Sequence, residues 1–266
     1  MASIVLNISA VEEQQEVLIS QLSELGAEGF EQKENILLAY FNELEIKSYE
    51  VNEILSSYTF ETSIIEERNW NEEWEKNFQP VRISDFCTIR AEFHKKIEPG
   101  KYDIIITPKM SFGTGHHATT YLMIQQMKDL NFSDKSVFDF GTGTGILAIL
   151  AEKLGASSVI ATDVDHWSRE NALENIERNN CRNIEVKLSS EIPQGFYDII
   201  LANINRNVLL HYLPHFKNVI TKNGLVLMSG ILSSDISDLI NFSLENGLQL
   251  RAQHEKDNWA SLLFIA

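Results

Sequence analysis

Hydrophobic and polar residues follow different patterns in the two parts of this chain. Up to about residue 65, short stretches with alternating apolar and polar residues, typical of strands, are interspersed with two stretches that have the apolar spacing of helices. The first helical stretch ends at Gly26, and glycine commonly terminates a helix. The predicted elements are strand 3–8, helix 11–25, strands 29–32 and 36–41, helix 44–55 and strand 58–65.

From about residue 81 the pattern changes to strands and helices in near alternation. Such alternation predicts a mostly parallel, doubly wound α/β sheet covered by helices. A hairpin at the end of the chain adds an antiparallel strand, so the sheet is expected to be mixed. The predicted elements are strands 81–83, 87–91 and 103–107, helix 121–130, strand 137–140, a helix from 146, strand 159–162, helix 167–179, strands 184–188 and 197–203, helix 208–220, strand 225–229, helix 234–245 and strands 248–254 and 260–265.

A segment rich in aromatic residues separates the two parts. Trp70, Trp74 and Phe78 recur every four residues, so they share one helix face, and a proline at position 80 ends the helix. The segment lacks the glycine and serine of a flexible linker, so it is expected to be semi-rigid. The order β-α-β-β-α-β before it is that of a small α+β ferredoxin-like domain. We therefore predict a ferredoxin-like domain at 1–66, a connector helix at 67–80 and a larger α/β domain at 81–266.

Composition indicates a soluble, cytoplasmic protein without a metal site. No apolar run approaches the roughly 20 residues of a membrane helix, and the first residues lack the features of a signal peptide. The only cysteines, Cys87 and Cys181, form no C-x-x-C pair, which fits a reducing cytoplasm. His116 and His117 are adjacent and have no third ligand nearby. Neither a membrane nor a metal is expected as a partner.

The formal net charge of −16 bears on the choice of partner. So acidic a chain repels phosphate backbones, and the densest basic spot is only the pair Lys95-Lys96, so direct nucleic-acid binding is not expected. Residues 1–55 hold eleven glutamates and two lysines, a net charge of −9. An acidic domain attracts basic proteins. Acidic surfaces also serve solubility alone, and the composition does not decide between the two.

The strongest chemical motif lies where an apolar strand is followed by three alternating glycines. Gly141, Gly143 and Gly145 precede a helix, and Asp163 ends the next predicted strand. Glycines allow the backbone to approach a ligand closely, and the carboxylate can accept hydrogen bonds from ribose hydroxyls. The third glycine comes one place earlier than in the dinucleotide fingerprint G-x-G-x-x-G. The spacing is similar to the cofactor loop of class I S-adenosylmethionine-dependent methyltransferases.

Two other segments place polar residues at the same edge of the predicted sheet. Strand 197–203 ends in Asn203, and ligands of such sheets lie at the carboxyl ends of the strands. A second glycine loop, 111–120, precedes a helix. Its Thr119 or Thr120 can cap that helix, and either can equally present a hydroxyl to the cofactor.

Three motifs together resemble the family that methylates ribosomal protein L11, the stalk-base protein of the large subunit. They are Phe112-Gly113-Thr114-Gly115-x-His117-x-Thr119-Thr120, Asp139-Phe140-Gly141-x-Gly143-x-Gly145-Ile146-Leu147-Ala148-Ile149 and Asp198-x-x-x-Ala202-Asn203-Ile204. The family also has a small amino-terminal domain joined by a helix to the catalytic domain, so the resemblance covers nearly the whole chain. The departures include His116 and Ala118, where the family usually has threonine and proline.

The resemblance implies methyl transfer from S-adenosylmethionine to lysine side chains or terminal amino groups of a basic ribosomal protein. Asn203 would hold the amine, and Phe112 would wall the methyl pocket. From the residues alone, Asn203 can instead cap a helix near 208, and Phe112 can be an ordinary core residue. The expected cofactor-binding residues are Thr120, Gly141, Gly143, Asp163 and Asn203.

The implied reaction sets a physical requirement on the acceptor. A lysine ammonium has no lone pair and an unperturbed pKa of about 10.4, so it must lose a proton before it attacks. A nearby sulfonium and a dry pocket both lower that pKa, and alignment of the reacting atoms supplies much of the rate. No general base is assigned.

Two alternatives remain open at this stage. One is a methyltransferase that acts on another protein or on a small amine, and the other is a non-catalytic binding module with the same fold. Methylation of adenine or glutamine is disfavoured, because the Asn-Pro-Pro-Tyr motif of those enzymes is replaced here by Asn203-Ile204-Asn205-Arg206.

Overall fold

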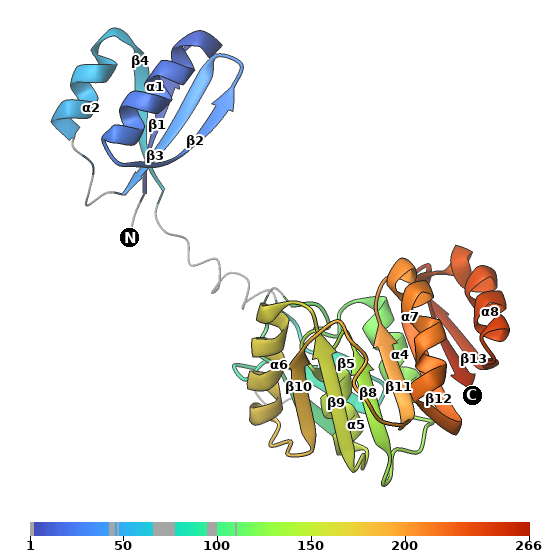
Figure 1. The fold of residues 1–266 in the computed structure, drawn as a ribbon. Helices are drawn as coiled ribbons and strands as arrows, with labels where there is room; N and C mark the ends of the chain where they lie inside the picture. The colour runs from blue at the N-terminus through green and yellow to red at the C-terminus, as the bar shows by residue number, and fades with distance from the viewer. Residues whose placement is uncertain (1–2, 43–45, 47, 66–77, 95–99, 110) are drawn as a thin grey trace. The chain divides into compact units, whose positions relative to one another are not determined.

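The computed structural model describes residues 3–42, 46, 48–65, 78–94, 100–109 and 111–266 (Figure 1). The chain separates into two compact units, residues 1–77 and 78–266. The predicted connector helix falls almost entirely on residues that lie outside the described ones. Phe78, the last aromatic residue of its stripe, is buried in the core of the second unit.

The amino-terminal unit has the predicted order β-α-β-β-α-β. Its elements are β1 (Ser3–Ser9), α1 (Glu12–Glu24), β2 (Ala27–Lys33), β3 (Ile36–Asn42), α2 (Ser48–Ile54), a short 3-10 helix (Leu55–Ser57) and β4 (Thr59–Ile65). The strands form one sheet in the order β2-β3-β1-β4 with antiparallel neighbours. Leu18 and Leu22 of α1 are fully buried in one core with Leu37 and Phe41 of β3. This unit therefore has a hydrophobic core of its own.

The second unit contains the remaining described elements. They are β5 (Val81–Ile83), β6 (Cys87–Arg90), β7 (Tyr102–Ile105), α4 (Ala118–Met127), β8 (Ser136–Phe140), α5 (Ile146–Lys153), β9 (Ser158–Asp163), α6 (His166–Arg178), β10 (Ile184–Leu188), β11 (Tyr197–Asn203), α7 (Arg206–Val219), β12 (Ile220–Leu232), a 3-10 helix (Ser233–Asp235), α8 (Ile236–Glu245), β13 (Gln249–Lys256) and β14 (Trp259–Ile265).

The main sheet of this unit is a doubly wound mixed sheet, as predicted. Its seven strands run in the order β10-β9-β8-β11-β12-β14-β13. The first five are parallel, and β14 is antiparallel to both of its neighbours. The closing hairpin turns through Asp257 and Asn258, whose φ angles of 52° and 64° suit a type I′ turn. The strand order reverses between β8 and β11, and ligands of such sheets bind at that point.

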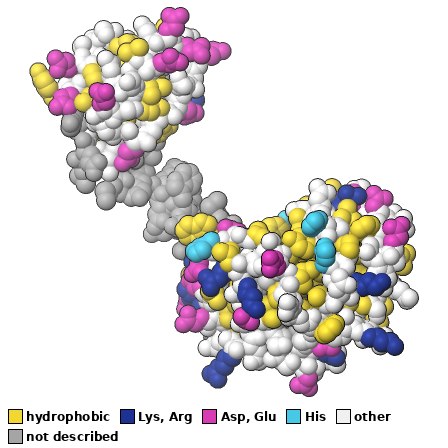
Figure 2. Space-filling model, in the orientation of Figure 1, with side chains coloured by type: hydrophobic (Ala, Val, Ile, Leu, Met, Phe, Trp, Pro, Cys, Tyr) yellow, Lys and Arg dark blue, Asp and Glu magenta, His cyan; other side chains and the backbone are white. Residues whose placement is uncertain are grey.

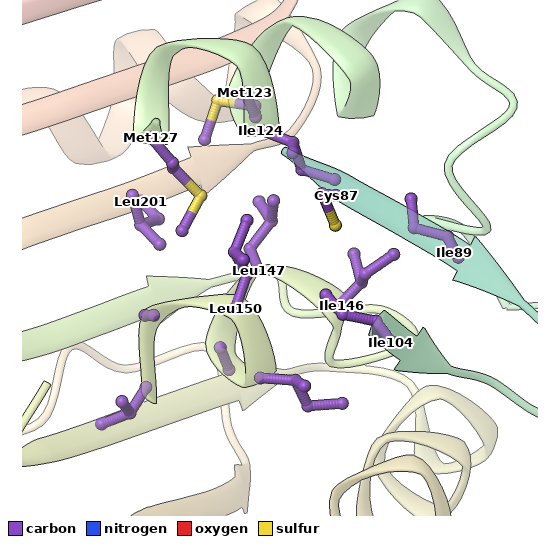
Figure 3. Packing of buried hydrophobic residues seen from close by; sticks show 14 of the residues in the cluster. Cys87, Ile89, Ile104, Met123, Ile124, Met127, Ile146, Leu147, Leu150 and Leu201 are labelled. Atoms are coloured by element: carbon purple, nitrogen blue, oxygen red, sulfur yellow. The ribbon is translucent and has the colours of Figure 1, made fainter. Parts of the chain in front are cut away.

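Apolar side chains fill both faces of the sheet. One cluster joins α4 and α5 to the small three-stranded sheet β5-β6-β7, and Figure 3 shows Ile89, Ile104, Ile146 and Leu147 within it. The other cluster lies under α7 and α8 and includes Phe216. Because both faces are covered, the ends of the strands remain as the place for a site.

β12 is longer than the predicted strand 225–229. Its parallel pairing with β11 starts at Ile220, and its antiparallel pairing with β14 continues to Leu232 beyond a register shift at Gly230. Sequence periodicity missed the early part of the strand because Thr221, Lys222 and Asn223 are polar.

Candidate active site

A cavity of about 450 Å³ opens at the carboxyl ends of the central parallel strands. Five of the predicted site residues line it, namely Phe112, Gly141, Gly143, Asp163 and Asn203. Thr120 is fully buried and is not a lining residue, whereas its neighbour Thr119 is one. The structure therefore brings together residues that are separated by almost a hundred positions in the sequence.

The first glycine loop is held in place by the end of β9. The φ angles of Gly141, Gly143 and Gly145 are 75°, 56° and 80°, a region that favours glycine. The Gly143 amide donates to Oδ2 of Asp163 at 2.8 Å, and the amides of Gly141 and Thr142 both donate to the Thr162 carbonyl at 2.9 Å. Asp163 thus organises this loop while its carboxylate faces the cavity.

The second glycine loop packs directly on the first. The Thr144 amide donates to the Phe112 carbonyl at 3.0 Å, and the Thr144 hydroxyl donates to the Gly113 carbonyl at 2.7 Å. A Cβ atom on Gly143 would lie 2.3 Å from the Phe112 carbonyl oxygen. Gly143 is therefore required to be glycine both by its φ angle and by the approach of the second loop.

Aromatic side chains wall the cavity beside this loop. Phe112 is 52% exposed, which contradicts the reading of it as a core residue. Its ring lies 5.2 Å from the His117 ring, which in turn lies 4.8 Å from Trp259. Sequence analysis missed Trp259, because the strand that carries it is far away in the sequence and no motif surrounds it.

The capping of helix α4 differs from the expectation. The Nδ1 atom of His117 accepts from the Thr119 amide at 3.3 Å and is 2.8 Å from the Thr119 hydroxyl, so His117 is the N-cap rather than either threonine. The helix consequently begins at Ala118, three residues before the predicted start. The described residues contain no group of three or more His, Cys, Asp or Glu side chains that could hold a metal ion.

Asn203 lines the cavity and has a buried amide oxygen without a hydrogen-bond partner. Its Nδ2 atom donates to the Thr120 hydroxyl at 3.2 Å, while its Oδ1 atom is buried without a hydrogen-bond partner. The alternative role as a helix cap is excluded, because Asn205 caps α7 by accepting from the Val208 amide at 3.1 Å. A buried amide oxygen without a partner is costly, and this makes it a candidate ligand-binding atom.

Asp139 is a second buried acceptor behind the glycine loop. Burial raises the pKa of Asp139 from 3.8 to about 7, although the hydrogen bond from the Thr142 hydroxyl, at 2.6 Å, acts in the opposite direction. Its Oδ1 atom has no partner among the described residues. Asp139 belongs to the motif that carries the resemblance, but its burial and its raised pKa follow only from the folded structure.

This pKa predicts a pH-dependent stability. In the unfolded chain Asp139 ionises near pH 3.8, whereas the folded protein keeps the proton up to about pH 7. The contribution to stability is therefore fully present below pH 3.8 and is lost as the pH rises to about 7, with a size on the order of 4 kcal/mol at most. Urea unfolding of the wild type and of Asp139→Asn across this range should give diverging stability curves. Parallel curves would mean that Asp139 does not carry this proton.

Comparison with known proteins decides the family. Residues 2–265 match the ribosomal protein L11 methyltransferase (PrmA) family. This chain belongs to that family. A ribosomal protein L11 methyltransferase of Porphyromonas gingivalis is 39% identical over 96% of this chain and 91% of its own length. One from Bacteroides thetaiotaomicron is 44% identical over 75% of this chain and 72% of its own length.

Solved structures agree with this assignment. The ribosomal protein L11 methylase of Lactobacillus delbrueckii subsp. bulgaricus has a TM-score of 0.66 at 30% identity and covers 70% of this chain and 98% of its own. A methyltransferase from Pyrococcus furiosus, at 20% identity and a TM-score of 0.53 over 61% of this chain and 88% of its own, shares the fold. The family membership and the methyltransferase class inferred from the three motifs are thereby confirmed, and so is the doubly wound α/β fold predicted from the alternation of strands and helices.

Proposed function

We propose that this protein transfers methyl groups from S-adenosylmethionine to lysine side chains or terminal amino groups of ribosomal protein L11. Curated relatives that match most of this chain are named as ribosomal protein L11 methyltransferases. The observation that carries the proposal is Asn203, which lines the cavity and whose buried Oδ1 atom has no hydrogen-bond partner. The N–H groups of an acceptor amine could donate a hydrogen bond to this oxygen.

The residues of the cavity fit the cofactor. Its volume, about 450 Å³, is within the usual range for small-molecule sites. Asp163 would accept hydrogen bonds from the ribose, and Gly141 and Gly143 keep the loop beside it free of side chains. We assign Thr120 a supporting role, because its hydroxyl accepts from Asn203. When bound, S-adenosylmethionine supplies a methyl group on a positively charged sulfur.

The protein's own groups then act on the acceptor amine. Asn203 Oδ1 holds an N–H of the neutral amine and so directs its lone pair toward the methyl group. Phe112 and Trp259 would lie against the bound molecules, and the loss of water on their binding would lower the pKa of the incoming ammonium, which gives its proton to bulk water as it enters. Most of the rate then comes from orientation, which can contribute about 7–11 kcal/mol in well-aligned reactions.

Removal of the Asp163 carboxylate is expected to weaken cofactor binding. Asp163→Ala should lose about 1.5–3 kcal/mol of binding free energy, the range for hydrogen bonds to a charged group. Isothermal titration calorimetry with S-adenosylmethionine measures this loss. The control is Asp165→Asn, which removes a charge two residues away while keeping a side chain that can cap α6. Equal affinities for Asp163→Ala and wild type would remove Asp163 from the site.

We assign the amino-terminal unit to docking of the protein substrate. Glutamates dominate its charge, and Figure 2 shows acidic side chains spread over its visible face. Glu12, Glu13 and Glu16 of α1 are exposed. A ribosomal protein is expected to be basic, and opposite charges raise the rate of association. Within this proposal residues 1–66 bind the substrate, 67–80 connect and 81–266 catalyse.

The proposed partners and location follow from the same substrate. No described helix is long and apolar enough to cross a membrane. We place the enzyme in the cytoplasm, where ribosomal proteins are made, and assign it neither a metal nor direct binding to nucleic acid.

The direct test is mass spectrometry of ribosomal protein L11 after incubation with the enzyme and S-adenosylmethionine. Mass increases of about 14 Da per methyl group, mapped to lysines or to the amino terminus, are the expected result. No increase on L11, together with methylation of a small amine or of another protein, would favour the alternative substrates. Absence of cofactor binding would leave only a non-catalytic role for the fold.

A further inference from the structure

Three asparagines, two in helix α6 and one at its C-cap, lie in the interior although they carry polar side chains. Asn171, Asn175 and Asn179 are four residues apart and therefore share one helix face. Asn171 and Asn175 are fully buried, and Asn179 is 8% exposed. Asparagine is an unfavourable residue inside helices, and buried polar groups need partners, so this buried row requires a specific set of hydrogen bonds.

Their partners are backbone groups along one edge of β7 and the residues just after it. Asn179 binds both the amide and the carbonyl of Ile105, at 3.0 and 2.6 Å. Oδ1 of Asn175 accepts from the Thr107 amide at 2.7 Å, and Nδ2 of Asn171 donates to the Thr107 carbonyl at 3.3 Å. The asparagines therefore bind this edge much as a neighbouring strand would.

The two repeats match in length. Four residues of helix rise about 6 Å, and two residues of strand about 6.6 Å, so Asn179 and Asn175 can meet Ile105 and Thr107. The opposite edge of β7 pairs with β6. The asparagine ladder thus satisfies backbone groups that would otherwise be unpaired at an edge.

Asn175 also makes a hydrogen bond to the first glycine loop, which the other two asparagines do not. Its Nδ2 atom donates to Asn171 Oδ1 at 2.7 Å and also to the Thr144 carbonyl at 2.8 Å. Thr144 belongs to the first glycine loop, and its amide and hydroxyl hold Phe112 and Gly113 of the second loop. The buried side chain of Asn175 therefore links two segments. One is Thr107, which lies just before the second glycine loop, and the other is Thr144 of the first glycine loop, which borders the cavity.

We propose that Asn175 is a positioning residue for methyl transfer, acting through Thr144 on the placement of Phe112. The inference rests on the proposed function. Asn175 does not line the cavity. The side-chain amide of Asn175 makes hydrogen bonds to both Thr107 and Thr144. We infer that these bonds fix the position of the first glycine loop relative to the segment before the second.

The experiment compares Asn175→Ala with Asn179→Ala. Both variants remove a buried amide that bonds the same edge, so both should lower the melting temperature by similar amounts. Only Asn175→Ala should also lower kcat on L11 at saturating substrates, by about 10- to 100-fold, the cost of a small misplacement near the reacting atoms. Where alanine prevents folding, the matched pair Asn175→Ser and Asn179→Ser serves instead.

A double-mutant cycle with Thr144→Val separates positioning from stability. Thr144→Val removes the hydroxyl bond to Gly113 but keeps the shape of the side chain. Its effect on kcat should be strongly non-additive with Asn175→Ala and additive with Asn179→Ala. Additivity in both pairs, or equal activity losses for the two asparagine variants, would overturn the proposal.

The outcome does not depend on whether L11 is the substrate. A wild type that is inactive on L11 would show that the proposed function is wrong. The same double-mutant cycle would then be measured as S-adenosylmethionine affinity by calorimetry. Weaker cofactor binding by Asn175→Ala, coupled to Thr144→Val and absent in Asn179→Ala, is the expected result. Uncoupled affinities would reject the positioning role.

Discussion

Replacement of Asn203 by alanine is expected to lower kcat for methylation by about 100-fold. The change removes the buried, unpartnered amide oxygen of a residue that lines the cavity, so the amine would lose the contact proposed to orient its lone pair. Cofactor affinity and the KM for the protein substrate should change less, because Asp163 and the docking unit remain. Steady-state kinetics and calorimetry on the same sample measure the separate effects.

Two variants sharpen this test. Asn246→Ala removes a hydrogen bond to the Phe242 carbonyl at the end of α8, away from the cavity lining, so it should cost about 1 kcal/mol of stability but leave kcat near the wild-type value. Asn203→Asp keeps an acceptor but adds a negative charge, which raises the pKa of the bound amine and should move the rate profile to higher pH. An unchanged kcat in Asn203→Ala would exclude the amine-holding role.

The sequence contained enough information for the strands and loops that build the site. Gly141, Asp163 and Asn203 each follow an apolar run, and the ends of parallel strands meet at one edge of a sheet. Local periodicity therefore predicted which residues converge. It could not predict which of two neighbouring threonines faces the cavity, because that depends on the start of α4, and the capping by His117 sets this start.

Other parts of the site depend on contacts between distant segments. Gly230 is an example, since a Cβ atom there would lie 2.1 Å from the carbonyl oxygen of Ile204, next to Asn203. Nothing in the sequence around Gly230 indicates this approach. The buried asparagines at and near the end of α6 left no clear signal either, because polar residues at every fourth position of a helix usually indicate a solvent-exposed face, and only the fold shows that these bind a strand edge.

The largest effect on the protein substrate is expected from removal of the amino-terminal unit. A chain of residues 78–266 should keep its cofactor affinity, because the described lining of the cavity comes entirely from this unit. Its kcat/KM on intact L11 should fall by about 100-fold or more, since a tethered docking site raises the effective concentration of the acceptor. Calorimetry and methylation kinetics measure the two quantities.

The point of truncation matters for the interpretation. Phe78 is 6% exposed, its carbonyl lies 2.6 Å from Nε2 of His94, and its ring contacts His116. A chain that starts at the predicted boundary, residue 81, would lose this buried ring and is expected to be less stable by about 3–5 kcal/mol. A loss of activity in the 81–266 chain alone would therefore report instability rather than docking.

A short peptide that carries the acceptor lysine distinguishes docking from chemistry. Such a peptide is too small to use a separate docking unit, so the full chain and the 78–266 chain should methylate it at the same rate. The loss on intact L11 should in addition be smaller at high salt, because salt weakens attraction between the acidic unit and a basic substrate over about 8 Å. If the shortened chain were as fast as the full chain on intact L11, substrate recognition would have to lie within the catalytic unit itself.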